Sequence, residues 1–202
     1  RSVDGAKSRA QHCLATSEQL IELAADCGAE TEASPFIAKV METAADIARL
    51  FEDALAAGQL SEADLFDDKY RPIAGTNPQQ FTTRFLAFTD RVLPPIQEPL
   101  LAFSDKVVFC AAVDRNGYLP THNLKFSRPQ GADPVWNAAN CLNRRIFDDR
   151  TGLAAARNTR KFLLQTYRRD MGGGRFVLMK DLSAPIVVNG RHWGGLRIGY
   201  RF

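Results

Sequence analysis

The chain has 202 residues, of which 45% are hydrophobic and 24% are charged, and its formal net charge is +3 at pH 7. These are the values of an ordinary soluble globular protein, and the length suffices for one core with an added helical layer. Apolar runs fall well short of the ~18 residues that span a bilayer, which excludes a membrane-spanning helix within the chain.

The charge is distributed unevenly. Residues 1–104 carry a net charge of −7 and eight Glu, whereas residues 105–202 carry +10 and no Glu. Because Glu favours helices and Asp favours turns, this predicts a helical region at 1–104 and a different architecture at 105–202, forming one compact unit. The positive charge fits a solvated strand face or an anionic partner. Nucleic acid is not expected, since the arginines are spread out and no nucleic-acid motif accompanies them.

In the first region, apolar residues recur with the helical period of 3.6. Gly28 and Gly58 are natural helix stops, and the Pro- and Gly-containing stretch 67–80 predicts a loop. The sequence therefore predicts helices over residues 6–27, 35–57 and 81–93, with a short helical turn at 61–65.

In the second region the period changes to two, which indicates strands. Strands are predicted at 107–114, 118–123, 161–170 and 175–182 and in a closing hairpin at 186–202, with a helix at 133–147. Residues 148–159 predict a loop, with a helix over Leu153–Ala156 as the alternative. The expected fold class is α+β: an N-terminal helical layer followed by a five-stranded antiparallel sheet with a covering helix at 133–147.

The closing hairpin gives the strongest local signal. Asn189 and Gly190 predict a type I′ turn, in which both central residues have positive φ. In the second arm, even positions such as His192 form a mostly apolar face. The odd positions, including Trp193 and Arg197, form a basic face that we expect to be open.

The four cysteines, at positions 13, 27, 110 and 141, have no CxxC spacing. A zinc site or a thioredoxin-like motif is therefore not expected. Isolated thiols in predicted helices and in the core favour a reducing compartment, although a disulfide between Cys13 and Cys27 is an alternative.

Four phrases follow one another in the second region: DRNGYLPTHN, NRRIFDDRTG, QTYRRDMG and APIVVNGRHWGGLRIGYRF. In this order they resemble the PAS-like, Cache-related sensory domain of bacterial methyl-accepting chemotaxis proteins. The preceding LFDDKYRPIAGTNPQQ looks like the helical portion of such receptors, so the resemblance covers about 65–202. The Glu- and Ala-rich methylation helices of these receptors are absent from the chain.

The resemblance implies a non-catalytic sensor that binds a small ligand and acts on signalling helices of the same receptor. It also implies a homodimer formed through the N-terminal helices. A cytoplasmic location is expected, with a periplasmic sensor of a membrane-anchored receptor as the alternative.

The predicted helix 133–147 carries Trp, Asn, Arg and Phe on one stripe, a mixture that suits a ligand pocket better than a filled core. Arginine recognises carboxylates through two parallel hydrogen bonds, so we expect a small, anionic, carboxylate-bearing ligand. An internal Arg–Asp network is the alternative. The residues expected to line the pocket are His122, Trp136, Asn140, Arg144, Tyr167, Arg169 and His192.

Catalysis is not expected. Asp114, His122 and Ser127 match no known triad order, and the sequence has no GxSxG motif. No cofactor or metal is expected either. One alternative is a haem-based gas or redox sensor with His122 or His192 as axial ligand. Another is a structural dimerisation module with a filled core and no ligand.

Overall fold

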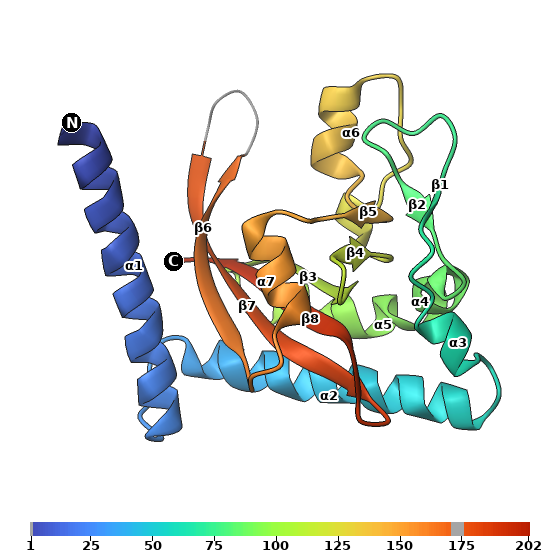
Figure 1. The fold of residues 1–202 in the computed structure, drawn as a ribbon, viewed down its shortest axis with the longest axis horizontal. Coiled ribbons are helices and arrows are strands. Elements are labelled where there is room, and N and C mark those ends of the chain that lie inside the picture. Colours follow the sequence, from blue (N-terminus) through green and yellow to red (C-terminus); the bar gives the residue numbers. More distant parts are fainter. Residues whose placement is uncertain (1, 171–175) are drawn as a thin grey trace.

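The computed structural model describes residues 2–170 and 176–202, without the side chains of 2–4, 6, 7, 11, 169 and 170. The chain begins with helices and ends with strands, as the change of period predicted (Figure 1). The helices before the main sheet are α1 (Ser2–Asp26), α2 (Ser34–Ala56), α3 (Glu62–Leu65), α4 (Leu86–Val92), α5 (Pro94–Gln97) and the 3-10 helix η1 (Pro99–Ala102).

The helix predicted at 81–93 begins later than expected. Strand β2 (Phe81–Thr82) pairs with β1 (Arg71–Pro72) in a small antiparallel sheet, and α4 starts only at Leu86. Phe81 also donates its backbone N–H to the carbonyl oxygen of Arg144 at 2.7 Å. Residues 81–82 are therefore extended because they pair with segments far away in the sequence.

The main sheet is antiparallel, in the order β3-β8-β7-β6. It has four strands, so the prediction of five is wrong. The expected strand at 118–123 is reduced to β4 (Tyr118–Leu119), which pairs with β5 (Arg145–Ile146) in a separate sheet. Pro120 has no N–H to donate and ends this strand. The main strands are β3 (Val107–Asp114), β6 (Leu163–Asp170), β7 (Phe176–Val188) and β8 (Arg191–Arg201).

The predicted covering helix is also wrong. Helix α6 (Pro134–Asn140) is only seven residues long and packs beside the 3-10 helix η2 (Leu124–Phe126). Arg144 has a φ of 63°, which a right-handed helix cannot contain, and the chain then enters β5. The helical alternative after residue 148 is confirmed, because α7 (Arg150–Arg157) lies against β7 and β8.

The main core lies between α2 and one face of the main sheet. Val40, Ile47 and Phe51 of α2 are fully buried there with apolar residues of β7 and β8, and α2 runs across these strands in Figure 1. Each such side chain contributes about 1.5–3 kcal/mol through burial. Because α2 covers one face of the sheet with apolar side chains, the opposite face remains available for polar groups.

The closing hairpin confirms its turn prediction, with φ of 50° at Asn189 and 76° at Gly190. Its alternation is broken by a register shift between Ile186 and Val187. A bulge moves the neighbouring side chains to the opposite face. Trp193 is therefore 1% exposed in the main core rather than on an open face, and its Nε1 donates to the carbonyl oxygen of Leu65 at 3.0 Å.

In the described ranges 2–170 and 176–202, no helix is both long and apolar enough to cross a bilayer. All four cysteines are free; those at 110 and 141 are buried and those at 13 and 27 are exposed. The disulfide that the sequence left open is not formed.

Candidate functional site

The residues predicted to line one pocket lie in several parts of the fold. Trp136 is 45% exposed on α6, and the Asn140 amide donates back to its carbonyl oxygen at 2.9 Å. Tyr167 belongs to the edge strand β6, where its hydroxyl lies 4.0 Å from the sulfur of Met179. The side chain of Arg169 lies outside the described residues.

His192 lies at the start of β8 and is half-buried. Burial lowers the pKa of His192, which keeps the imidazole neutral at pH 7. Its Nε2 is enclosed without a hydrogen-bond partner among the residues that the structure describes.

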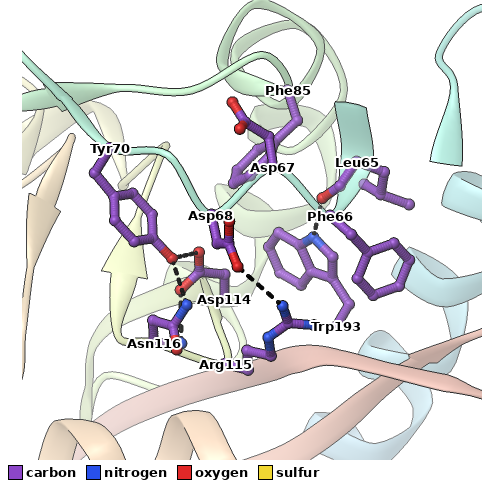
Figure 2. A pocket seen from close by; sticks show the side chains of 10 residues that line it. All are labelled: Leu65, Phe66, Asp67, Asp68, Tyr70, Phe85, Asp114, Arg115, Asn116 and Trp193. Atoms are coloured by element: carbon purple, nitrogen blue, oxygen red, sulfur yellow. Dashed lines mark hydrogen bonds and ion pairs between the residues drawn. The ribbon is translucent and has the colours of Figure 1, made fainter. Parts of the chain in front are cut away.

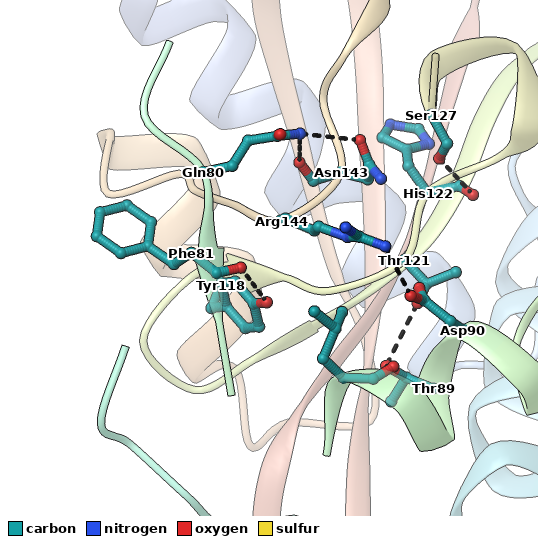
Figure 3. A network of polar contacts seen from close by, with 11 residues as sticks. Gln80, Phe81, Thr89, Asp90, Tyr118, Thr121, His122, Ser127, Asn143 and Arg144 are labelled. Atoms are coloured by element: carbon teal, nitrogen blue, oxygen red, sulfur yellow. Dashed lines mark hydrogen bonds and ion pairs between the residues drawn. The ribbon is translucent and has the colours of Figure 1, made fainter. Parts of the chain in front are cut away.

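Arg144 and His122 do share one polar network (Figure 3). His122 is buried between Phe109 and Phe126, with ring centroids at 5.6 and 4.9 Å. Its Nδ1 accepts the backbone N–H of Asn123 at 2.7 Å, so the imidazole carries no proton on that nitrogen. The ring is thus a packed element at the border of the network.

The backbone of Arg144 is held on both sides. Its N–H donates to the carbonyl oxygen of Leu119 in β4 at 2.6 Å, and its carbonyl oxygen accepts from Phe81 in β2. These bonds maintain the positive φ of 63°, a strained conformation for a residue other than glycine. Such strain persists only where the surroundings over-determine it, so the hydrogen bonds to β2 and β4 fix the backbone from which this side chain extends.

The guanidinium of Arg144 reaches Asp90 of α4. Its Nη2 lies 3.0 Å from Oδ2 of Asp90, while the hydroxyl of Thr121 donates to Oδ1 at 2.7 Å (Figure 3). The side chains of Arg144 and Asp90 are 38% and 34% exposed. Both side chains are therefore partly accessible to solvent.

One buried polar atom in this network, Nε of Arg144, has no hydrogen-bond partner among the described residues. Burial raises the pKa of Tyr118, while a side-chain hydrogen bond with Thr83 and the charge of Arg144 partly offset that rise. Tyr118 itself donates to the carbonyl oxygen of Phe81 at 2.8 Å. An unpaired buried polar group costs about 1–3 kcal/mol.

A second cluster surrounds Asp114 at the end of β3 (Figure 2). Its Oδ2 accepts from the Tyr70 hydroxyl at 2.6 Å, and its Oδ1 accepts the backbone N–H groups of Asn116 and Tyr118 at 2.9 and 3.0 Å. Burial raises the pKa of Asp114 to about 6, against the lowering effect of these hydrogen bonds. The adjoining cavity, bounded by Trp193 and Phe85, is about 10 Å³, the size of one water.

The third polar feature lies within the main sheet. Arg197 of β8 and Asp181 of β7 form a buried ion pair, with Nη2 and Nε of Arg197 at 2.7 and 3.1 Å from Oδ2. Burial raises the pKa of Asp181, and the guanidinium opposes that rise. The expectation of an open basic face on β8 is wrong at Arg197, because its charge is neutralised inside the protein.

A wider groove of about 410 Å³ separates α2 from α5 and η1. Pro95, Ile96 and Phe103 form much of its apolar wall. The two charged residues at its rim, Lys39 and Asp46, already pair with Glu42 and Arg49. The groove thus presents no unpaired charge toward a ligand.

Within the described residues, no group of three His, Cys, Asp or Glu side chains could hold a metal ion. Among the described residues, the network around Arg144 brings together a partly exposed guanidinium, a positive φ and a buried N–H without a hydrogen-bond partner. It combines a cation with hydrogen-bond donors, an arrangement that can hold a small oxyanion.

Comparison with known proteins assigns no family to the chain. No family model matches the chain, and no curated protein matches it. A solved structure described as an extracellular ligand binding receptor from Desulfohalobium retbaense DSM5692 is similar over 86% of this chain, with 16% identity and a TM-score of 0.34. The match spans 26% of that receptor, so its properties are not transferred to this chain.

Proposed function

We propose that this chain is a non-catalytic sensing module that binds a small anionic molecule at Arg144. The observation that supports this most is the buried Nε–H of Arg144, which lacks a hydrogen-bond partner in the described part of the chain. A carboxylate oxygen that accepts from this N–H would remove the penalty of leaving it unpaired.

The surroundings suit an anion that enters from solvent. Asp90 orients the guanidinium through Nη2, and the buried Nε–H keeps its hydrogen-bonding capacity for a ligand. The net charge of +10 in residues 105–202 attracts anions over longer distances. Because Arg144 lies between β2 and β4 and reaches α4, an anion bound there would strengthen the connection among these elements.

The finer part of the proposal is a place in a bacterial chemoreceptor or a related signal transducer, where signalling helices of the same receptor would respond. It rests on the four sequence phrases described above. A ligand that shifts a two-state balance from 1:99 to 99:1 must prefer one state by roughly 5.5 kcal/mol. Charge-assisted hydrogen bonds of about 1.5–3 kcal/mol each supply a large part of that preference.

The test begins with a thermal-shift screen of small mono- and dicarboxylates, followed by calorimetric titration of the best compound. Arg144→Ala should weaken its binding by about 10- to 150-fold, which corresponds to losing one charged hydrogen-bonding group. Arg144→Lys should recover only part of the affinity, because an ammonium lacks the planar fork.

Arg91→Ala is the matched control. Arg91 follows Asp90 on α4 and is exposed, and its guanidinium lies over the ring of Phe88 at 5.6 Å. This variant should bind like the parent. Equal affinity in Arg144→Ala and the parent would refute the site, and the absence of binding by any carboxylate would refute the proposed ligand class.

A further inference from the structure

Tyr118 connects the two polar clusters. Its backbone N–H donates to Oδ1 of Asp114 at 3.0 Å, and its hydroxyl donates to the carbonyl oxygen of Phe81 beside Arg144. Its ring lies 5.2 Å from the ring of Tyr70, which in turn donates to Oδ2 of Asp114. Tyr118 is fully buried, so a change at Asp114 acts directly on its position.

We propose that proton binding at Asp114 controls the geometry around Arg144 through Tyr118. This names the regulation of the anion site and rests on the proposed function for its biological meaning. The structural coupling itself needs no ligand and can be measured without one.

The hydrogen bonds determine where the proton goes. Oδ1 of Asp114 already accepts two backbone N–H groups, so a proton from solvent binds Oδ2. There it meets the hydroxyl hydrogen of Tyr70, and only one of the two O–H groups can donate to the other. The Tyr70 oxygen also accepts from Nδ2 of Asn116 at 2.8 Å. When the Asp114 O–H donates to the Tyr70 oxygen, the Tyr70 O–H needs another acceptor, and a neutral hydrogen bond replaces the charge-assisted one, so the contact weakens.

The surroundings of Asp114 place its protonation not far below neutral pH. Arg115, from the adjoining turn, lowers the pKa of Asp114, but its Nη2 lies 3.6 Å from Asp68 and is partly neutralised. Asp67 and Asp68 come from the segment that carries Tyr70 and line the same cavity (Figure 2). Burial dominates over these groups and raises the pKa of Asp114 to about 6.

The effect of Asp114 protonation reaches Arg144 through the side chain of Tyr118. When protonation reverses and weakens the hydrogen bond between Tyr70 and Asp114, the packing of the Tyr70 ring against Tyr118 changes, and the Tyr118 hydroxyl can leave Phe81. The Phe81 backbone in turn holds the carbonyl oxygen of Arg144. The arrangement seen here thus belongs to ionised Asp114, and acid pH should disorder the anion site.

The experiment follows the side-chain ¹⁵Nε–H resonance of Arg144, assigned with Arg144→Lys, between pH 8 and pH 5 in the ligand-free protein. The parent should show a titration with a midpoint of about 6, the pKa to which burial raises Asp114. Asp114→Asn should show no titration and a resonance close to the acid limit of the parent. Tyr70→Phe should move the midpoint upward, because the Tyr70 hydrogen bond lowers the pKa of Asp114.

Asp68→Asn is the control, since it removes an exposed carboxylate of the same cavity and should keep the titration. A flat resonance in the parent would overturn the coupling. A titration that persists in folded Asp114→Asn would assign it to another group and also overturn the coupling. Because no ligand is added, a negative result here is independent of whether carboxylates bind.

Discussion

Arg197 and Asp181, on neighbouring strands β8 and β7, form an ion pair in the interior of the sheet with 9% and 0% of their side chains exposed. Such a pair is not a ligand clamp, because each partner satisfies the other. Its two charges have lost their hydration, so each depends on the other for stability.

Breaking this pair should therefore be costly. Arg197→Ala leaves the buried carboxylate of Asp181 without its partner, and the free energy of unfolding should fall by about 3–5 kcal/mol. Replacing both residues, as in Arg197→Met with Asp181→Leu, should cost much less than the single change. Urea denaturation of the three proteins measures this, and additive losses would contradict the account.

Asp114 should make stability depend on pH. Its pKa is about 6 in the folded protein and 3.8 in the unfolded reference, so the folded state binds the proton more tightly. Stability from this group is full below about pH 4 and is lost as pH rises to about 6. The difference, at ~1.36 kcal/mol per pKa unit, amounts to about 3 kcal/mol.

Asp114→Asn removes this contribution. Relative to the parent, Asp114→Asn should gain about 3 kcal/mol in free energy of unfolding between pH 4 and pH 7, because only the parent loses stability over this range. Denaturant titrations at both pH values check it. A difference that stays constant with pH would show that Asp114 is not protonated in this range.

Gly194 allows close contact between β8 and β3. A Cβ atom there would overlap the backbone carbonyl oxygen of Val113, which cannot move without disturbing the sheet. Gly194→Ala should therefore lower the free energy of unfolding by about 1–3 kcal/mol. Gly131→Ala, where a Cβ would meet no described atom within 4 Å, should change it little. Equal effects would refute the close-contact explanation.

Helix α1 leaves an apolar stripe in solvent. Leu20 and Leu23 are each 60% exposed, while Ile21 and Ala25 on the other side pack against the core. We predict that this stripe forms the homodimer expected from the resemblance. Leu20→Glu should raise the dimer dissociation constant by at least tenfold, measured by sedimentation, with Gln19→Glu as the neighbouring control. A monomeric parent at high micromolar concentration would contradict this.

Local patterns predicted much of the fold. Helix α2 follows from its apolar period, and the hairpin turn follows from Asn189 and Gly190 alone. The bulge before Trp193 could not be predicted, because it depends on register against β7 and on packing with α2. Pro120 is a local signal that the strand predicted at 118–123 ends early. The alternating pattern of the neighbouring residues outweighed this signal in the prediction.

The site was only partly predictable. Arg144 was selected for a stripe on a helix that does not form, so its place in the proposed site rests on the tertiary contacts and not on that stripe. Asp90 and Thr83 lie in a segment predicted as a helix and carry no motif. Asp90 meets Arg144 across 54 positions of sequence, a contact that only the tertiary fold creates.

The most direct test of the account follows the ¹⁵Nε–H resonance of Arg144 at pH 7.5 while the best carboxylate from the screen is added. The account predicts a saturable shift of this resonance, with a midpoint equal to the calorimetric dissociation constant, and no comparable shift for Arg91. An unchanged Arg144 resonance at saturating carboxylate, or equal shifts for both arginines, would contradict it.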